Sequence, residues 1–422
     1  MNIAICVVAY NRLFSLKRLL SSLDDSEYPF PVKLYISVDK SDVDTVIQYV
    51  KTYHWRHGEL EIISHKRNLG LRKHILSCGD LLKKHDALVV LEDDIVVSPG
   101  FMLYATATIN EYINRNDIAG ISLYSFQVNY HSCQPFCPLR EESDVFLMQN
   151  AQSWGQIWLK KQWEEFKAWY AENNEDFSQM DHLPKSICNW SNRSWLKYHT
   201  RYCIERNKYF VYPYTSYTTC FSDNGEHIQD ETPIFQTHLN QSREIYLRFS
   251  PTVQYDTYFE NSRIYEWLGL TKEELCVDYY GDNGNRLNRR YWLSRLILPY
   301  KIIKSYGLRM RPYELNIKYD IPGNVFFLYD TNIKYIPEYT PKVRQQQFFY
   351  MYGTQFVDIE SFEIDLRNTQ HSNQDLQRLN ENLQNEIKTL FARRELEKRR
   401  TLLLVIAFSI LMIIRIFIKY MV

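Results

Sequence analysis

The sequence predicts an α/β fold in which a mostly parallel β-sheet has helices on both faces. Over the first 125 residues, short aliphatic runs alternate with stretches whose leucines recur at helical spacing. Strands that alternate with helices in this way form parallel sheets that are buried on both sides. Several aliphatic runs end in Asp, Glu or Asn. Parallel sheets bind ligands at the edge where their strands end, so these polar residues are candidates for a binding site.

Five strands are expected in this first part of the chain. They lie at 3–10, 32–39, 60–67, 86–93 and 118–125. Helices are expected between them, one after Asn11, one at 68–82, and one that begins near Ser98 or Pro99. The run at 86–93 is aliphatic up to its last residues, which predicts a strand in the middle of the sheet.

The composition changes after residue 125. Tryptophan-rich segments between 145 and 228, such as QSWGQIWLKKQWEEFKAWY and NWSNRSWLKYHTRYC, predict helices, and KYFVYPYTSYTTCF predicts a strand and a loop. Segment 288–312 is basic, aromatic and amphipathic. It fits either a patch at a membrane surface or a helix packed on the body of the protein. We therefore expect a second region at 126–230 and an accessory region at 231–360.

A helical stalk is predicted at 361–400. Its apolar residues recur at helical spacing and are Leu376, Leu379, Leu383, Ile387 and Leu390. Such a stripe is typical of a short coiled coil, so self-association through the stalk is expected.

The apolar segment 401–422 is about long enough to cross a bilayer core. The basic block FARRELEKRR precedes it, and the positive-inside rule places such a block in the cytoplasm. The N-terminal MNIAICVVAYNR lacks the basic region of a signal peptide. The sequence thus predicts a C-terminal anchor in the cell membrane and a cytosolic body. Arg415 leaves open the alternative of a helix that lies in the membrane interface.

The overall charge excludes some classes of partner. Lys and Arg total 50, as do Asp and Glu, so no strong field attracts nucleic acid or a polyacidic partner. The eight cysteines show no paired framework, and no second pair or histidine cluster completes a zinc site with Cys133 and Cys137. Buried thiols in a reducing compartment are expected.

Glu92 and Asp93 end the buried run at 86–93, and Asp94 follows it directly. Burying uncompensated carboxylates costs several kcal/mol each, so the cluster needs a solvated edge or a cation. Carboxylate oxygens suit Mg²⁺ or Mn²⁺, which can bridge the phosphates of a nucleotide. The alternative is a solvated turn in which Asp94 caps the next helix. The cluster closes a buried strand, and Asp39 ends another nearby, which favours the cation.

Four segments extend this pattern. They are VVAYNRLFSLKRLLSSL, ISVDKSD, RNLGLRKHILSCGDLL and LVVLEDDIVVSPGFM. In order and spacing they resemble GT-A-fold, nucleotide-sugar-dependent glycosyltransferases over about residues 1–228. The likeness is closest to the N-acetylglucosaminyltransferase type that starts hybrid N-glycans and to bacterial polysaccharide glycosyltransferases. It implies that 1–125 is the nucleotide-sugar-binding half of the domain and 126–230 the acceptor-side half.

The resemblance implies donor-binding roles for five residues. Arg12 would contact the nucleotide diphosphate, and Asp39 would hydrogen-bond the base. Arg72, at the start of its helix, would help to anchor the donor. Glu92 and Asp93 would hold the donor sugar and the ribose. Without the resemblance, Arg12 and Arg72 are equally explained as ordinary surface charges.

The resemblance also implies a cation site. Asp94 would bind Mn²⁺ or Mg²⁺ directly. His227, in the segment SDNGEH, matches a position at which a histidine lies near the metal and the diphosphate. The alternative for His227 is an ordinary loop residue.

The sequence departs from the family where a general base is expected. Inverting members have a carboxylate just before a tryptophan on the acceptor side, and the matching stretch here is 190–198. No Asp or Glu occurs between Asp181 and Glu205. A base within reach of the acceptor hydroxyl then has to come from Asp181, Asp223 or Glu226, or from another register of the match.

Three functions are compatible with these features. The first is a metal-dependent glycosyltransferase that acts on a glycan or lipid-linked acceptor in cell-surface polysaccharide synthesis. The second is a catalytically impaired relative that serves as a binding or scaffold protein at the membrane. The third, a nucleotidyltransferase, usually needs a glycine-rich loop after the first strand, and AYNRLFS contains no glycine.

Overall fold

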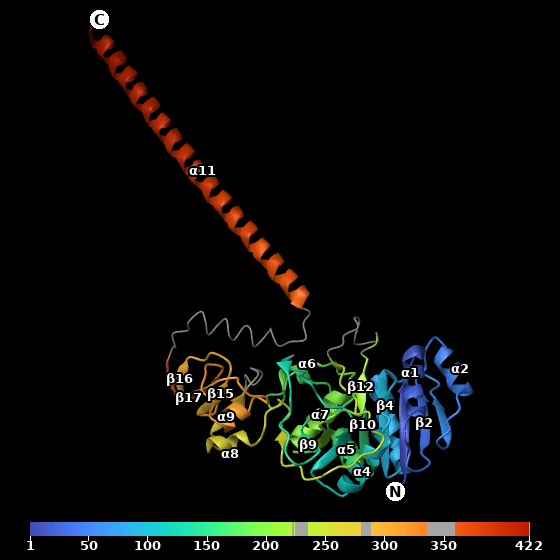
Figure 1. Ribbon diagram of the computed structural model, residues 1–422. Coiled ribbons are helices and arrows are strands. Elements are labelled where there is room, and N and C mark those ends of the chain that lie inside the picture. Colours follow the sequence, from blue (N-terminus) through green and yellow to red (C-terminus); the bar gives the residue numbers. More distant parts are fainter. Residues whose placement is uncertain (133, 222, 224–234, 280–287, 336–358, 422) are drawn as a thin grey trace. The chain divides into compact units, whose positions relative to one another are not determined.

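The computed structural model describes the backbone of residues 1–132, 134–221, 223, 235–279, 288–335 and 359–421. The side chains of 359–375 and most of those in 401–421 fall outside this description. The chain divides into two compact units, Met1–Gln355 and Phe356–Val422. Figure 1 shows the elements of both units.

A large mixed sheet forms the centre of the first unit. Among the described residues it has nine strands, in the order β13 (Gln254–Tyr255), β9 (Val145–Met148), β11 (Tyr209–Pro213), β6 (Ile118–Ser122), β10 (Gln156–Leu159), β4 (Ala87–Glu92), β1 (Ile3–Ala9), β2 (Lys33–Val38) and β3 (Leu60–Ser64). The pairings from β4 through β1 and β2 to β3 are all parallel. The predicted α/β class and the five predicted strands of the first part are confirmed.

Helices cover both faces of this sheet. One face packs on α1 (Leu13–Asp24), α2 (Thr45–Thr52) and α4 (Phe101–Tyr112), and the other on α3 (Leu71–Gly79), α5 (Lys160–Glu172) and α7 (Trp195–Glu205). Successive residues of β1 alternate between these cores: Ile5 and Val7 belong to the first and Cys6 and Val8 to the second. Because both faces are buried, the strand is aliphatic throughout.

The predicted tryptophan-rich helix begins later than expected. Residues 156–159 form strand β10, which runs antiparallel between β4 and β6. Ile157 packs on one face of the sheet and Trp158 on the other, so this short segment is buried on both sides. Gly155, with φ 97°, separates it from the preceding residues. A continuous apolar run of this kind does not distinguish a buried strand from a helix by its periodicity.

A strand directly after the acidic cluster pairs with a strand from a distant part of the sequence. β5 (Ile95–Val97) pairs antiparallel with β12 (Thr218–Cys220). The remaining short elements of the same half are η1 (Asp80–Lys83), β7 (Val128–Asn129), β8 (Gln134–Pro135) and α6 (Lys185–Asn189).

A second, smaller sheet occupies the accessory region. Its strands, in order, are β14 (Leu275–Asp278), β15 (Tyr291–Ser294), β17 (Phe326–Lys334) and β16 (Tyr300–Tyr306), accompanied by α8 (Ile264–Leu268) and α9 (Leu315–Lys318). A packed helix at 288–312 was one of two expectations, and it is wrong, because β15 and β16 lie there. Trp292 and Leu293 pack into different clusters on opposite faces, which is the period of a strand. The membrane-surface patch stays a prediction.

The second unit contains one long helix, α11 (Ile359–Met421). Helix α11 includes the residues of the predicted stalk, and the stalk itself stays a prediction. Within the part of the chain that the structure describes, no helix combines the length and apolar character needed to cross a membrane. Most side chains of the predicted anchor at 401–422 lie outside the described residues, so the anchor stays a prediction.

Candidate functional site

The carboxyl ends of the parallel strands meet at one edge of the central sheet. There β4 ends at Glu92, the first of residues 92–94, here called the acidic turn, and Glu92 pairs with Val8 of the neighbouring β1. Arg12 follows β1, and Asp39 follows β2. The strand pattern therefore brings Arg12, Asp39 and the acidic turn to the same edge, as the sequence predicts.

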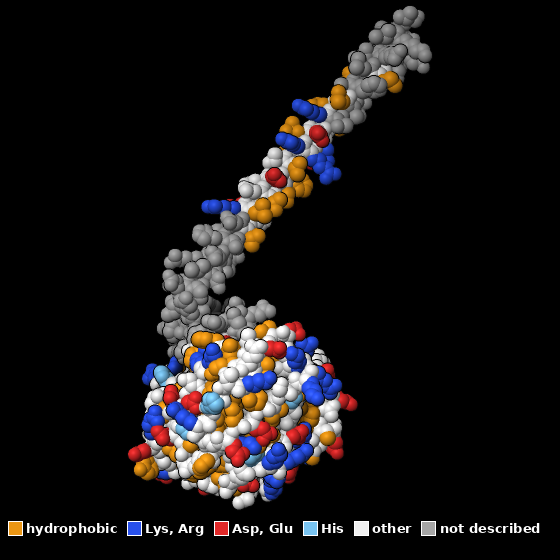
Figure 2. All heavy atoms as spheres, turned by 90° about the vertical axis from the view of Figure 1, so that its right-hand side faces the viewer, with side chains coloured by type: hydrophobic (Ala, Val, Ile, Leu, Met, Phe, Trp, Pro, Cys, Tyr) orange, Lys and Arg blue, Asp and Glu red, His pale blue; other side chains and the backbone are white. Residues whose placement is uncertain are grey.

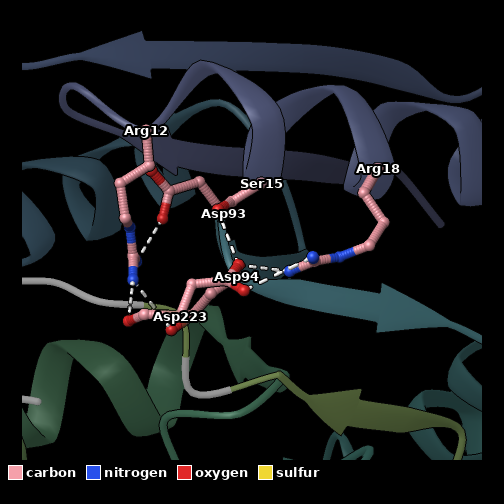
Figure 3. Close-up of polar contacts among 6 residues, drawn as sticks. All are labelled: Arg12, Ser15, Arg18, Asp93, Asp94 and Asp223. Carbon is pink, nitrogen blue, oxygen red and sulfur yellow. Dashed lines mark hydrogen bonds and ion pairs between the residues drawn. The ribbon is translucent and has the colours of Figure 1, made fainter. Parts of the chain in front are cut away.

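Arg12 supplies positive charge to the acidic turn. Its Nη1 donates to Asp94 Oδ2 at 3.1 Å, and its Nη2 forms an ion pair with Asp93. Figure 3 shows Arg12 close to these carboxylates. Burial alone would lower the pKa of Arg12, but the negative charges of Asp93 and Asp94 outweigh burial and hold the pKa above its ordinary value. The side chain is therefore a permanent counter-charge.

Burial has the opposite effect on two carboxylates of the turn. It raises the pKa of Glu92 to about 8, with the charge of Asp94 adding to the shift. It also raises the pKa of Asp93 to about 6, although the ion pair with Arg12 opposes this. Both carboxylates are costly to keep ionised without further positive charge. The acidic turn thus favours a cation or a hydrogen-bonding ligand.

Asp223 is fixed to helix α1 by side chains that the sequence analysis did not single out. Ser15 Oγ donates to Asp223 Oδ2 at 2.6 Å, and Arg18 forms an ion pair with the same carboxylate. The backbone carbonyl of Asp223 accepts from Arg12 Nη1 at 3.2 Å (Figure 3). Burial alone would raise the pKa of Asp223, but Arg18 and Ser15 lower it below its ordinary value. The spacing of residues 12, 15 and 18, which puts them on neighbouring turns of one helix face, was the available signal.

These contacts bear on the candidates for a general base. The Asp223 carboxylate is ionised and already paired with Arg18, so it has little tendency to take a proton. Glu226 and the predicted metal ligand His227 lie outside the described residues. Asp181 is exposed and does not line the cavity described below.

Asp39 orders the loop that leads into helix α3. Its carboxylate is 5% exposed and accepts backbone N–H groups of Lys40 at 2.9 Å, Leu69 at 2.9 Å and Gly70 at 3.0 Å. Gly70 has φ 74°, a conformation that favours glycine. These bonds tie the end of β2 to the start of α3. Contact between Asp39 and a nucleotide base stays a prediction.

Arg72 lies apart from the other predicted donor ligands. Its Nη1 is 3.4 Å from Asp176 Oδ1, and its guanidinium lies 4.8 Å from the centroid of the Tyr198 ring. It is not among the residues that line the cavity, although the preceding Gly70 and Leu71 are. Through its contact with Tyr198, Arg72 of α3 packs against α7.

A cavity of about 840 Å³ opens at this edge of the sheet. Its volume is typical of sites that enclose a small-molecule ligand. Six of the residues predicted from the sequence line it together: Arg12, Asp39, Glu92, Asp93, Asp94 and Asp223. We call Arg12, Asp39 and the acidic turn the donor edge.

Another part of the cavity lining is aromatic and hydroxylic. It is lined by residues that we call the indole wall: Trp154, Trp190, Ser191, Ser194 and Trp195. All five residues come from region 126–230, which the resemblance implies is the acceptor-side half. Trp195 also interacts with the side chain of Glu92, which links this wall to the acidic turn. Indole faces and hydroxyl groups suit the apolar faces and hydroxyls of a sugar.

A buried lysine holds part of the indole wall in place. Lys197 is 1% exposed, and its Nζ donates to the carbonyls of Phe177 at 2.5 Å, Cys188 at 2.9 Å and Trp190 at 2.8 Å. It also donates to Asn192 Oδ1 at 2.7 Å. Burial lowers the pKa of Lys197. The ammonium group therefore joins segments on both sides of Trp190. Because its partners are neutral, no pattern of opposite charges in the sequence indicates this role of Lys197.

The carboxylates of the acidic turn suit a cation whose coordination is completed by a bound ligand. Among the described residues, no group of three or more His, Cys, Asp or Glu side chains is arranged to hold a metal ion. Asp94 nevertheless offers hard oxygen atoms beside the cavity. Mg²⁺ and Mn²⁺ are commonly held by one or two carboxylates together with phosphate oxygens and water. Such a cation would bind together with a phosphate-containing ligand rather than in a preformed cage.

No known protein family and no curated protein matches the sequence. Among solved structures, the chain is similar to TarS 1–349 of S. aureus in complex with UDP-GlcNAc, with 15% identity and a TM-score of 0.31 over 54% of this chain and 60% of that one. It is also similar to the mannosyltransferase PcManGT from Pyrobaculum calidifontis in complex with GDP-Man and Mn²⁺, with 11% identity and a TM-score of 0.32 over 54% and 59% of the two chains. The chain thus spans less than two thirds of each of these structures.

Proposed function

We propose that the protein is a metal-dependent glycosyltransferase that takes its sugar from a nucleotide-sugar donor. One observation supports this above all: a single cavity is lined by two groups of residues, an arginine with an acidic turn and the indole wall. The first group suits a diphosphate with its cation, and the second suits a sugar. The resemblance of the four sequence segments points to the same activity.

The residues of the donor edge have separable tasks in this proposal. Arg12 would bind the diphosphate, and Asp39, by ordering the 68–70 loop, would shape the place of the nucleoside. Asp94 would hold Mn²⁺ or Mg²⁺, which when bound offsets charge on the diphosphate. Glu92 and Asp93 would receive sugar or ribose hydroxyls. Transfer forms a bond from the acceptor oxygen to the anomeric carbon, breaks the bond to the diphosphate and releases the hydroxyl proton to a base.

Calorimetry with nucleoside diphosphates tests the donor site. We expect at least one of the UDP, GDP, ADP and CDP set to bind when Mn²⁺ is present and to bind far more weakly with EDTA. Asp94→Asn should lower the affinity at least tenfold, about 1.4 kcal/mol. The exposed Asp42→Asn variant serves as the matched control. Absence of binding to all four diphosphates in the presence of Mn²⁺ would overturn the proposal.

A second candidate function rests on the carboxylates that line the cavity. Among the described residues, Asp223 is paired with Arg18 and the other lining carboxylates belong to the donor edge, which leaves no identified base and favours a catalytically impaired protein that binds the same donor. Slow hydrolysis of a nucleotide sugar separates the two candidates. Turnover that requires Mn²⁺ and is lost in Asp94→Asn identifies an enzyme, whereas donor binding without any turnover identifies a binding protein.

The same proposal includes attachment to the cell membrane through 401–422, with the body of the protein in the cytosol and a glycan or lipid-linked acceptor. The apolar sequence of this segment and the basic block before it support attachment. Membrane fractionation tests it. The full chain should stay with membranes after alkaline washing, and a chain that ends at residue 400 should not. Recovery of both in the soluble fraction would contradict it.

A further inference from the structure

Helix α11 exposes a line of large apolar side chains. Leu376, Leu383 and Leu390 are between 49% and 63% exposed, and Leu379 and Ile387 fall in the same range. Figure 2 shows apolar side chains along one side of this helix. Exposed apolar surface of this length is unusual on a soluble helix and indicates a partner.

The spacing of these residues identifies the kind of partner. Leu376, Leu383 and Leu390 stand seven residues apart, as do Asn380 and Ile387 between them. The two series alternate by four and three residues, so the leucines take the d positions of a heptad and the other two take the a positions. The seam continues until residues 394 and 397, where Arg and Glu would take the next a and d positions. Before it, the same frame places Asn373 at a and Thr369 at d, so the apolar seam begins at Leu376.

The identities at these positions favour two parallel strands. Leucine at d with isoleucine at a is typical of parallel dimers. Asn380 at an a position fits an in-register pair, in which it meets the same asparagine of the other copy. A single polar a residue of this kind sets register and oligomeric state at some loss of stability. Leu379 and Phe391 flank the seam at g and e and widen its apolar surface.

The charges beside the seam argue against a lipid surface as the occupant. Between residues 376 and 391 there are two basic residues, Arg378 and Lys388, and two acidic ones, Glu381 and Glu386. The stretch is therefore neutral, whereas helices that lie on anionic membranes have a basic polar face. Asn380 within the seam is a further obstacle to burial in lipid.

We propose that two copies of this chain pair through residues 376–390 as a parallel, in-register coiled coil. This pairing is independent of the proposed function, since it depends only on α11. A dimer of this kind has two copies of the cavity, one in each chain. Its occupant is a second copy of the chain, because the heptad is complementary to itself.

Cysteine cross-linking of the full chain in detergent tests the register. Leu383→Cys places a thiol at d, and Asn385→Cys places one at f, two residues away on the outer side of the helix. Mild oxidation should give a disulfide-linked dimer at least fivefold more efficiently from the first variant than from the second, after subtraction of the wild-type background. Equal yields from the two variants would overturn the in-register seam.

The mass of the chain in detergent tests the pairing itself. Light scattering should give two chains for the wild type and one for the double variant Leu383→Asp, Ile387→Asp. Asn385→Asp is the matched control and should remain a dimer, and near-UV circular dichroism should show the same tryptophan packing in all three. Asn380→Ile should add larger species to the dimer. A wild type of one chain, or a double variant that still pairs, would contradict the proposal.

Discussion

The two sides of the cavity are held in place by opposite means. At the donor edge, carboxylates are balanced by arginines, as in the contact of Arg12 with Asp94 and that of Arg18 with Asp223. Beside the indole wall, the buried ammonium group of Lys197 has neutral oxygen partners in the bonds that fix Trp190. The donor edge is thus electrostatically prepared for a ligand with its own charge. The indole wall, in contrast, is uncharged, and the ammonium group of Lys197 that supports it hydrogen-bonds to oxygen atoms within the protein.

This difference indicates that the two parts of the cavity suit different parts of a ligand. A site for a diphosphate and a cation needs charged groups that exchange partners, and in the proposed function Arg12 would exchange Asp93 for a phosphate. A surface for a neutral sugar needs rings held at fixed positions, which the hydrogen bonds of Lys197 provide. We therefore expect substitutions at the two sides to have separable effects on stability and on nucleotide binding.

Lys197→Met is the variant with the largest expected effect. It leaves buried carbonyl oxygens without donors, which should lower the free energy of unfolding by on the order of 3 kcal/mol. Denaturant titration measures this as a lower midpoint with an unchanged slope. Hydrogen exchange should increase between residues 186 and 196 but not at 68–70. Lys185→Met, at an exposed lysine of α6, is the control. Equal midpoints for the two variants would show that Lys197 does not support the wall.

The same contrast explains how far the sequence predicts the site. Asp39 and the acidic turn follow aliphatic strands, and parallel strands bring their carboxyl ends together, so local sequence was enough to place them. The indole wall combines side chains from segments near 154 and 190–195, and only tertiary packing brings these together. β10 was missed for the same reason, because its burial on both faces hides the period of a strand. Arg72 followed the family pattern but packs against Asp176.

Glu92→Gln tests whether burial at the donor edge makes ionisation of Glu92 unfavourable. Glu92 has its pKa raised to about 8 from 4.5, so the folded state keeps a proton that the unfolded state releases. This contribution to stability is full below pH 4.5 and is lost as the pH rises toward 8. In EDTA, the wild type should lose on the order of 2 kcal/mol more than Glu92→Gln between about pH 5 and pH 7.

The measurement is chemical denaturation at a series of pH values. The control is Glu111→Gln, at an exposed position of α4, which should follow the wild type at every pH. Parallel stability curves for Glu92→Gln and the wild type would show that burial at the donor edge does not penalise the charged carboxylate.

Asp39→Asn should have the smallest effect on stability and a local one. The asparagine has the same shape but only one accepting oxygen, so it cannot accept from both Lys40, which bonds Oδ1, and Gly70, which bonds Oδ2. We expect a loss of about 1 kcal/mol, because the remaining oxygen keeps part of the network. Hydrogen exchange should increase at residues 68–70 and remain unchanged on the indole wall, the reverse of Lys197→Met. Asp42→Asn, on the surface nearby, should change neither. If Asp39→Asn loosened both sides of the cavity, they would be one cooperative unit, and the separation of a charged donor edge from an independently fixed aromatic wall would be wrong.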